Sequence, residues 1–193
     1  MPVSILRRPT VSSPRLAPVE PRYAPLFCFA LLTAACALAS FAFACATPFA
    51  AFAVIAAAAL PLQPALLVSL AAWLVNQTIG FGFLHYPLDA TTIAWGLVIG
   101  GAALAATAAA AAVLRLTKHT GTAVALGVAL IGAYAAYELV LFAATPFLGG
   151  AEDFTVAIVG RLGLLSVLWA IGLVAACEVA RLCNHALRRQ TAS

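Results

Sequence analysis

Long runs of apolar residues, separated by short polar or proline-marked connections, dominate the chain after residue 24. A helix that crosses the ~30 Å hydrocarbon core of a membrane needs roughly 20 apolar residues at 1.5 Å rise per residue. Runs of about this length or longer occur five times, at 26–46, 65–83, 91–116, 122–144 and 154–182. The pattern predicts an all-α protein built from membrane-spanning helices.

A sixth apolar run, Phe49 to Leu60, is shorter and is bounded by Pro48 and Pro61. As a helix it would extend only about 20 Å, which is less than the thickness of the hydrocarbon core. The run therefore fits either a short crossing or a re-entrant segment. These two interpretations give a six-span and a five-span topology.

Basic residues distinguish the two topologies, because cytoplasmic loops carry the excess of Lys and Arg. Four Arg precede the first run, a second basic group lies at 115–118, and a third lies at 181–189. The connections 85–89 and 149–153 contain no Lys or Arg. An even number of crossings must separate the first two basic groups, which requires the short run to cross. We expect an integral membrane bundle of six transmembrane helices with both termini cytoplasmic, and a five-span bundle is the alternative.

This topology divides the chain into three parts. Residues 1–24 are polar and proline-rich and are expected to form a disordered cytoplasmic tail. Residues 25–186 form the transmembrane domain, and residues 187–193 form a second cytoplasmic tail. Ala44-Cys45-Ala46 resembles a signal-peptide cleavage site, but the first run is too long for a signal peptide and further spans follow it. We expect an uncleaved, multi-pass protein of the cell inner (plasma) membrane.

Composition supports this class and excludes others. Hydrophobic residues make up 65% of the 193 residues and charged residues 8%, whereas a soluble domain is about half apolar and a quarter charged. The net charge of +4 follows from membrane topology, so the lipid bilayer and not nucleic acid is the expected partner. Six spans leave no room for a nucleotide-binding domain, and no GxxxxGK[ST] motif is present.

Catalytic and metal-binding patterns are missing from the sequence. There is no HExxH or GxSxG motif, and the three His lie far apart. The five Cys have no CxxC spacing, so we interpret them as small apolar packing residues. We therefore expect no enzyme activity, no metal and no cofactor.

Four polar side chains interrupt the apolar runs: Asn76, Gln77, Glu138 and Arg161. A charge at the centre of a bilayer costs roughly 2.5–3.5 kcal/mol on insertion scales, so such residues usually face the bundle interior or water. In the expected topology all four lie about two turns from the outer end of their helices. They share one layer in the outer half of the bilayer, which predicts a polar site there.

Aromatic residues extend this predicted site. Tyr134 lies four residues before Glu138, on the same helical face. The outer loop 80–87 alternates Gly with aromatics and contains His85 and Tyr86, which would form a gate. A cavity with aromatic walls and a few polar groups is typical of a small-molecule site. The alternative is structural: Glu138 and Arg161 form an ion pair, and Asn76 holds helices together.

In size, topology and the short proline-bounded segment 47–61, the chain resembles the substrate-binding (S) components of energy-coupling-factor vitamin transporters. Those proteins often carry an AxxxA surface on the first helix, and Ala30xxxAla34 and Ala35xxxAla39 match it here. The resemblance implies uptake of a vitamin or a transition metal, with an energising ATPase and coupling subunit supplied by other chains.

These observations lead to one functional hypothesis and one alternative. We expect a membrane protein for small-molecule uptake, with Asn76, Gln77, Tyr134, Glu138 and Arg161 lining a site between the third, fifth and sixth helices. The alternative is a non-transporting membrane subunit or assembly factor that packs its Ala- and Gly-rich faces against partner helices.

Overall fold

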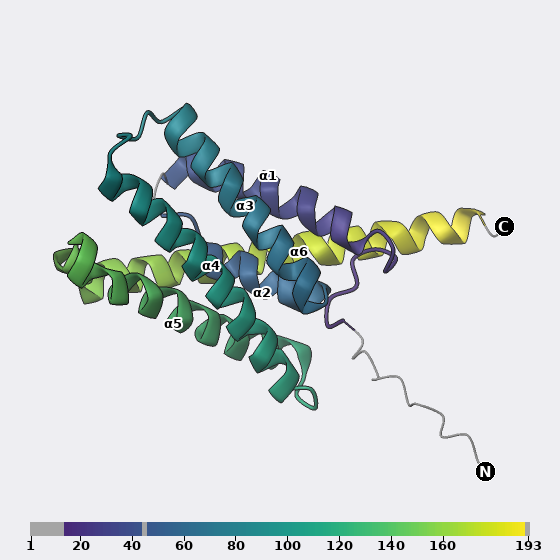
Figure 1. The fold of residues 1–193 in the computed structure, drawn as a ribbon. Helices are drawn as coiled ribbons and strands as arrows, with labels where there is room; N and C mark the ends of the chain where they lie inside the picture. The colour runs from purple at the N-terminus through teal and green to yellow at the C-terminus, as the bar shows by residue number, and fades with distance from the viewer. Residues whose placement is uncertain (1–13, 44–45, 192–193) are drawn as a thin grey trace, which may run out of the picture.

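A computed structural model describes residues 14–43 and 46–191 of the chain. Within these ranges the protein is all-helical, as the apolar runs predict. It contains six α-helices and one short 3₁₀-helix: α1 (Ala24–Phe43), α2 (Phe49–Ala59), α3 (Leu62–Gly82), α4 (Ala90–Leu116), α5 (Thr122–Leu148), η1 (Ala151–Asp153) and α6 (Val156–Thr191). The helices form a bundle in which successive α-helices alternate in direction (Figure 1).

All of the α-helices except α2 are long and apolar enough to cross a membrane, judged by length and composition. The protein is thus a multi-pass helical membrane protein. Helix α2 has only 11 residues and is too short for an ordinary span. Pro48 directly precedes it, and Leu60 is extended, as expected for a residue before Pro61.

Helix α2 forms the centre of the bundle (Figure 1). Every residue of the helix except Ala57 is buried, and the helix contacts each of the other five α-helices. A helix that is apolar on all sides is stable only when it is surrounded, and FAAFAVIAAAA is apolar throughout. The long helices therefore pack around α2 and leave their outer faces to lipid.

The segment 14–23 packs under one end of the bundle. The Arg15 side chain donates hydrogen bonds to the carbonyl oxygens of Thr117 and of Thr120 (2.7 Å for Thr120), in the turn between α4 and α5. The backbone amides of Arg15 and Leu16 donate to the Ala58 carbonyl at 2.9 and 3.1 Å, and Leu16 is buried. This part of the segment expected to be disordered therefore makes specific contacts, and the rest of it, residues 1–13, lies outside the described residues.

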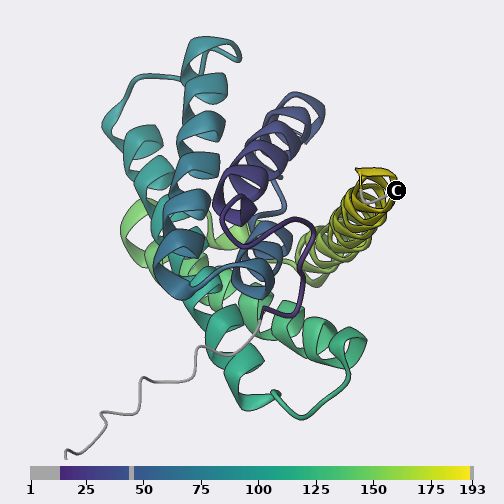
Figure 2. The same ribbon diagram turned by 90° about the vertical axis from the view of Figure 1, so that its right-hand side faces the viewer.

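The two ends of the bundle differ in charge. We call the end that contains the segment 14–23, the turn 117–121 and the C-terminal part of α6 the basic end, because Arg15, Arg22, Arg115, Lys118 and Arg181 lie there. The connections 46–48, 83–89 and 149–155 form the opposite, acidic end, which carries Asp89 and Glu152. Figure 2 shows α6 running past the other helices toward the basic end.

Helix α6 continues to Thr191, through residues that we expected to form a tail. The candidate membrane span within this helix covers Val156–Ala186. Beyond it, Leu187, Arg188, Arg189 and Gln190 are all favourable helix formers, so the polar extension stays helical outside the apolar span.

Glycines on α4 allow α3 to approach closely. A Cβ atom placed on Gly100 would lie 2.8 Å from the ring of Trp73, and one on Gly96 would lie 2.5 Å from Oε1 of Gln77. The Trp73 ring cannot easily move away, because its Nε1 donates a 2.8 Å hydrogen bond to the Gly96 carbonyl. Gly101, the next residue along α4, has open space around the same position.

This contrast predicts different effects for two adjacent substitutions. Gly100→Ala should destabilise the protein by about 1–3 kcal/mol, because the new methyl group overlaps a fixed indole ring. Gly101→Ala should be neutral or stabilising, because it adds helix propensity without a clash. Thermal unfolding of both variants in the same detergent measures the difference. Equal shifts of the unfolding midpoint would show that α3 and α4 do not pack as described.

Candidate functional site

A cavity of about 430 Å³ lies at the acidic end, among α2, α4, α5 and α6. Its volume is within the range of about 300–1,000 Å³ that small-molecule sites usually occupy. The connection 46–48, the N-terminus of α2, the first turns of α4, the second half of α5 and the first half of α6 supply its walls. Its lining residues include Thr47, Phe49, Thr92, Trp95, Ile99, Tyr134, Tyr137, Glu138, Leu141, Gly150, Phe154, Leu162 and Ser166.

Glu138 is the chemically distinctive residue of this cavity. Its Oε1 atom is buried and has no hydrogen-bond partner within the described part of the chain. A buried polar atom without a partner costs about 1–3 kcal/mol, and more if it is charged. The nearby Tyr134 hydroxyl donates to the carbonyl oxygen of Val159 on α6 at 2.6 Å. The Tyr134 hydroxyl also interacts with the Glu138 carboxyl, and the Oε1 atom of Glu138 keeps an open acceptor position in the cavity.

Aromatic side chains hold the cavity walls in place. The Phe49 ring is stacked on Tyr137 with centroids 6.2 Å apart, and its edge meets Phe52 at 5.9 Å. Phe154 meets Phe142 edge to face at 5.3 Å, across the α5–α6 connection. Such pairs stabilise the side chains by about 0.5–1.5 kcal/mol beyond area burial. The cavity is therefore preformed, with α2 and α5 joined on one wall and α5 and α6 on another.

Two local features determine the backbone conformation beside the cavity at the acidic end. Gly149 and Gly150 adopt positive φ angles of 81° and 86°, which ends α5 and turns the chain past the cavity. Asp89 caps α4 by accepting hydrogen bonds from the Thr92 amide (2.8 Å) and hydroxyl (3.0 Å). These bonds to its charged form lower the pKa of Asp89. The cap fixes Thr92 at the cavity lining.

A buried polar network lies beside the cavity. Nδ2 of Asn76 donates to the hydroxyl oxygens of Ser40 (2.9 Å) and Thr47 (3.1 Å), and Nε2 of Gln77 donates to Oδ1 of Asn76 (3.1 Å). These bonds join α1, the α1–α2 connection and α3. Asn76 thus reaches the cavity only through Thr47, which is a lining residue. The contacts match the structural alternative considered for Asn76, in which it holds helices together.

The structure therefore brings together two of the seven predicted site residues, Tyr134 and Glu138, in the cavity lining. Arg161 is exposed on α6, and it makes no ion pair with Glu138. Gln77 lies against Gly96 and bonds to Asn76. The predicted site lay between the third, fifth and sixth helices, whereas the cavity lies among α2, α4, α5 and α6.

The loop residues His85 and Tyr86 are also outside the lining. His85 adopts a positive φ of 55°, which is uncommon for a residue other than glycine. The Tyr86 ring packs over Gly80 and meets Phe81 edge to face at 6.1 Å. The loop therefore folds back on the end of α3.

Sequence reasoning missed the contributions of α2, α4 and the start of α6. Thr92, Trp95 and Ile99 follow the i, i+3, i+7 spacing of one helical face, which places them together on α4. Trp95 on that face is the one aromatic residue of α4, a helix rich in Ala and Gly, and it was the available signal. Ser166 is a buried hydroxyl in the apolar run of α6 and was a second such signal.

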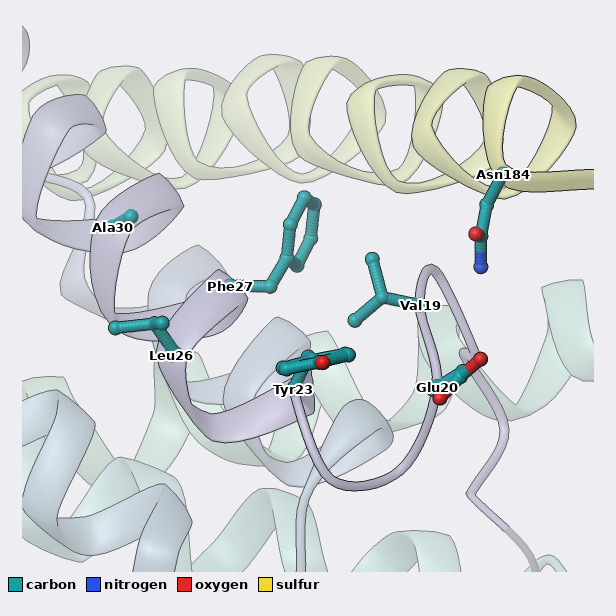
Figure 3. Close-up of a pocket in the computed structure, with 7 residues that line it drawn as sticks. All are labelled: Val19, Glu20, Tyr23, Leu26, Phe27, Ala30 and Asn184. Atoms are coloured by element: carbon teal, nitrogen blue, oxygen red, sulfur yellow. The ribbon is translucent and has the colours of Figure 1, made fainter. Parts of the chain in front are cut away.

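Two further cavities lie along the gap between α1 and α6. Figure 3 shows one of about 380 Å³, where Phe27 points from α1 toward α6 and Asn184 points back from α6. Glu20 at its edge forms an ion pair with Arg22 at 2.9 Å. The other cavity, of about 390 Å³, is lined only by apolar side chains and Gly172. Among the described residues, neither is lined by a buried polar side-chain atom without a partner, so we assign the site to the cavity at Glu138.

Comparisons with protein-family models, with curated proteins and with solved structures find no match to this chain. The class that can be stated is therefore the one that the helices define, a multi-pass helical membrane protein.

The network at Asn76 predicts a measurable loss of stability. Asn76→Leu removes two hydrogen bonds that leave α3, to Ser40 and Thr47. Because interhelical bonds in membrane proteins average about 0.6 kcal/mol, we expect a loss of about 1 kcal/mol. The control is Thr78→Val, because the Thr78 hydroxyl is exposed and bonds only to the Leu74 carbonyl of its own helix at 2.8 Å. Thermal unfolding in lipid nanodiscs measures both, and a smaller loss for Asn76→Leu than for the control would refute this role.

Proposed function

We propose that this chain is a small-molecule uptake protein of the inner (plasma) membrane that binds its substrate in the cavity at Glu138. The observation that carries the proposal is a buried, unpartnered carboxylate oxygen in a preformed aromatic cavity of ligand size. In a membrane bundle such a polar group normally serves function, because structure alone would favour an apolar residue. The mechanism is binding and reorientation without catalysis.

The proposed topology has six crossings, both termini in the cytoplasm and the cavity open to the outside. Its main support is the distribution of charge, since of the Lys and Arg between 14 and 191 only Arg161 belongs to the acidic half of the bundle. A second support is the contact of Arg15 with the carbonyl of Thr120. The meeting of the segments on either side of α1–α4 at one end supports an even number of crossings between them, with α2 as one of the four.

The proposal includes the resemblance to S components, in which an energising ATPase and a coupling subunit are separate chains. The expected AxxxA contact surface divides in the structure. Ala30 and Ala34 are exposed on α1 and available to a partner helix, whereas Ala35 and Ala39 are buried within this bundle. If a coupling subunit docks on α1, it would use the first pair.

The alternative proposal, a non-transporting subunit or assembly factor, draws on the gap between α1 and α6. Exposed apolar residues of both helices, such as Leu26, Phe29, Leu168 and Ile171, border a surface that a partner helix could cover. Purification in a fixed complex, without any bound small molecule, would favour this alternative.

A cavity-filling variant tests the uptake proposal. Leu162 lines the cavity, whereas Leu164, two residues further along α6, is exposed on the outside of the bundle. Leu162→Trp should abolish retention of a non-lipid small molecule by the purified protein, because the indole occupies the binding volume. Leu164→Trp should retain it as the wild type does. Native mass spectrometry of the three proteins gives the readout.

The opposite results are equally informative. A small molecule that stays bound to Leu162→Trp lies outside this cavity. If the wild type retains none, and cells expressing it accumulate no solute that control cells lack, the uptake proposal is wrong.

A further inference from the structure

We propose that the substrate is a small organic cation, an ammonium group on an apolar or aromatic body, whose charge lies beside Glu138. This inference rests on the proposed binding function of the cavity and adds the chemical class of its ligand. It follows from the charge, the hydrogen-bond capacity and the shape of the lining.

The first observation is the sign of charge in the cavity. Glu138 is the only lining residue that is ionised in its ordinary state near neutral pH, and the lining contains no Lys, Arg or His. Arg161, the one Lys or Arg that the described residues place in this half of the bundle, is exposed on α6 and makes no ion pair with Glu138. A positive group on the ligand would therefore meet an uncompensated carboxylate.

The N-terminus of α2 contributes electrostatic potential of the opposite sign, because Phe49 and Ala50 also line the cavity. A helix N-terminus carries the equivalent of about half a positive charge, which favours anions. Here the first turn is partly satisfied within the chain, since the Phe49 amide donates to Thr47 (2.9 Å) and the Ala51 amide donates to Pro48 (3.0 Å). The unit charge of a carboxylate is larger than this partial positive charge, so the helix end does not reverse the sign of charge in the cavity.

The hydrogen-bonding groups point to the same sign. The Oε1 atom of Glu138 accepts no hydrogen bond from the described residues. The Tyr134 hydroxyl donates to the Val159 carbonyl at 2.6 Å and also interacts with the Glu138 carboxyl, so its one proton is engaged within the chain and its oxygen can still accept. These two groups therefore present acceptors to a ligand, and an ammonium group supplies the matching donors.

The aromatic walls distinguish an organic cation from a metal ion. Trp95, Tyr137 and Phe154 line the cavity, and aromatic faces attract ammonium groups, Trp most strongly. A transition metal ion instead needs several His, Cys or carboxylate ligands. The cavity offers one carboxylate, and within the described residues no group of three or more His, Cys, Asp and Glu is placed to hold a metal. Of the substrates that the sequence suggested, a vitamin or a metal, the structure favours the organic molecule.

Three probes that share one body test the inference: 3-phenylpropylammonium, 3-phenylpropan-1-ol and 3-phenylpropanoate. They carry the same phenyl ring on a three-carbon chain, which ends in a positive, a neutral or a negative group. Calorimetric titration into the protein in neutral-lipid nanodiscs, with empty nanodiscs as the blank, gives a Kd for each. We expect the ammonium to bind at least about tenfold more tightly than the alcohol, and the carboxylate to bind most weakly.

Matched variants locate the preference. Glu138→Gln keeps the shape of the side chain, and it should reduce the preference for ammonium over alcohol to about twofold or less while leaving alcohol binding unchanged. Glu138→Asp should retain a preference for the cation. Glu152→Gln removes an exposed acid of the acidic end that does not line the cavity, and it should behave as the wild type. Alcohol binding in each variant confirms that the cavity is still folded.

The outcomes separate this inference from the proposed function. If the alcohol or the carboxylate binds as tightly as the ammonium, the inference is overturned and the binding cavity stands. If the preference for ammonium persists in Glu138→Gln, the charge lies elsewhere and the assignment to Glu138 is overturned. If none of the three probes binds, both the inference and the binding function of this cavity fail.

Discussion

The burial of one short apolar helix organises this protein. Helix α2 can exist only where other helices cover it on every side, and all five long helices do so. Because most of its residues are alanine, the surrounding helices approach closely, and the buried core contains few large side chains. Close contact of this kind, more than a difference in hydrophobicity, holds membrane helices together.

The same helix accounts for the cavity. Its 11 residues extend about 17 Å, whereas the 27 residues of α4 and of α5 extend about 40 Å. A central helix that is shorter than its neighbours leaves a hollow beyond one of its ends. At the basic end the segment 14–23 closes that space through Arg15 and Leu16. At the acidic end no such plug is present among the described residues, and the cavity with Glu138 occupies the space above Phe49.

The extent of each helix along the chain was easier to predict from the sequence than the arrangement of the helices around one another. Apolar runs mark where helices begin and end, because a run length translates directly into a depth in the membrane. The predicted α2 and α4 agree with the structure to within one residue. The lateral order of helices is different, since it depends on which faces meet. Depth alone suggested that Arg161 joins Glu138, but the Arg161 side chain is exposed on α6.

Two other site residues show the same limit. Asn76 lies in the apolar run of α3 as predicted, but its partners are Ser40 and Thr47, two small hydroxyls that no hydropathy pattern distinguishes. In the sequence, Trp95 lies near a helix end, which is typical of an interfacial anchor. In the structure it lines the cavity together with residues of α2 and α5. The position of Glu138 was recognisable because an acid within an apolar run is rare whatever its neighbours are.

Two buried serines provide the most direct test of the proposal that the cavity above α2 opens to the outside of the cell. Both side chains are less than 5% exposed. They differ in their surroundings, because Ser166 lines the cavity whereas Ser69 is packed against Thr107. With Cys45 and Cys183 replaced by serine, each position is changed to cysteine and treated with a charged, membrane-impermeant methanethiosulfonate. Ser166→Cys should react in intact cells and not in sealed inverted vesicles, while Ser69→Cys reacts in neither. Reaction of Ser166→Cys only from the inverted side, or no faster than Ser69→Cys, would contradict an outward-facing cavity.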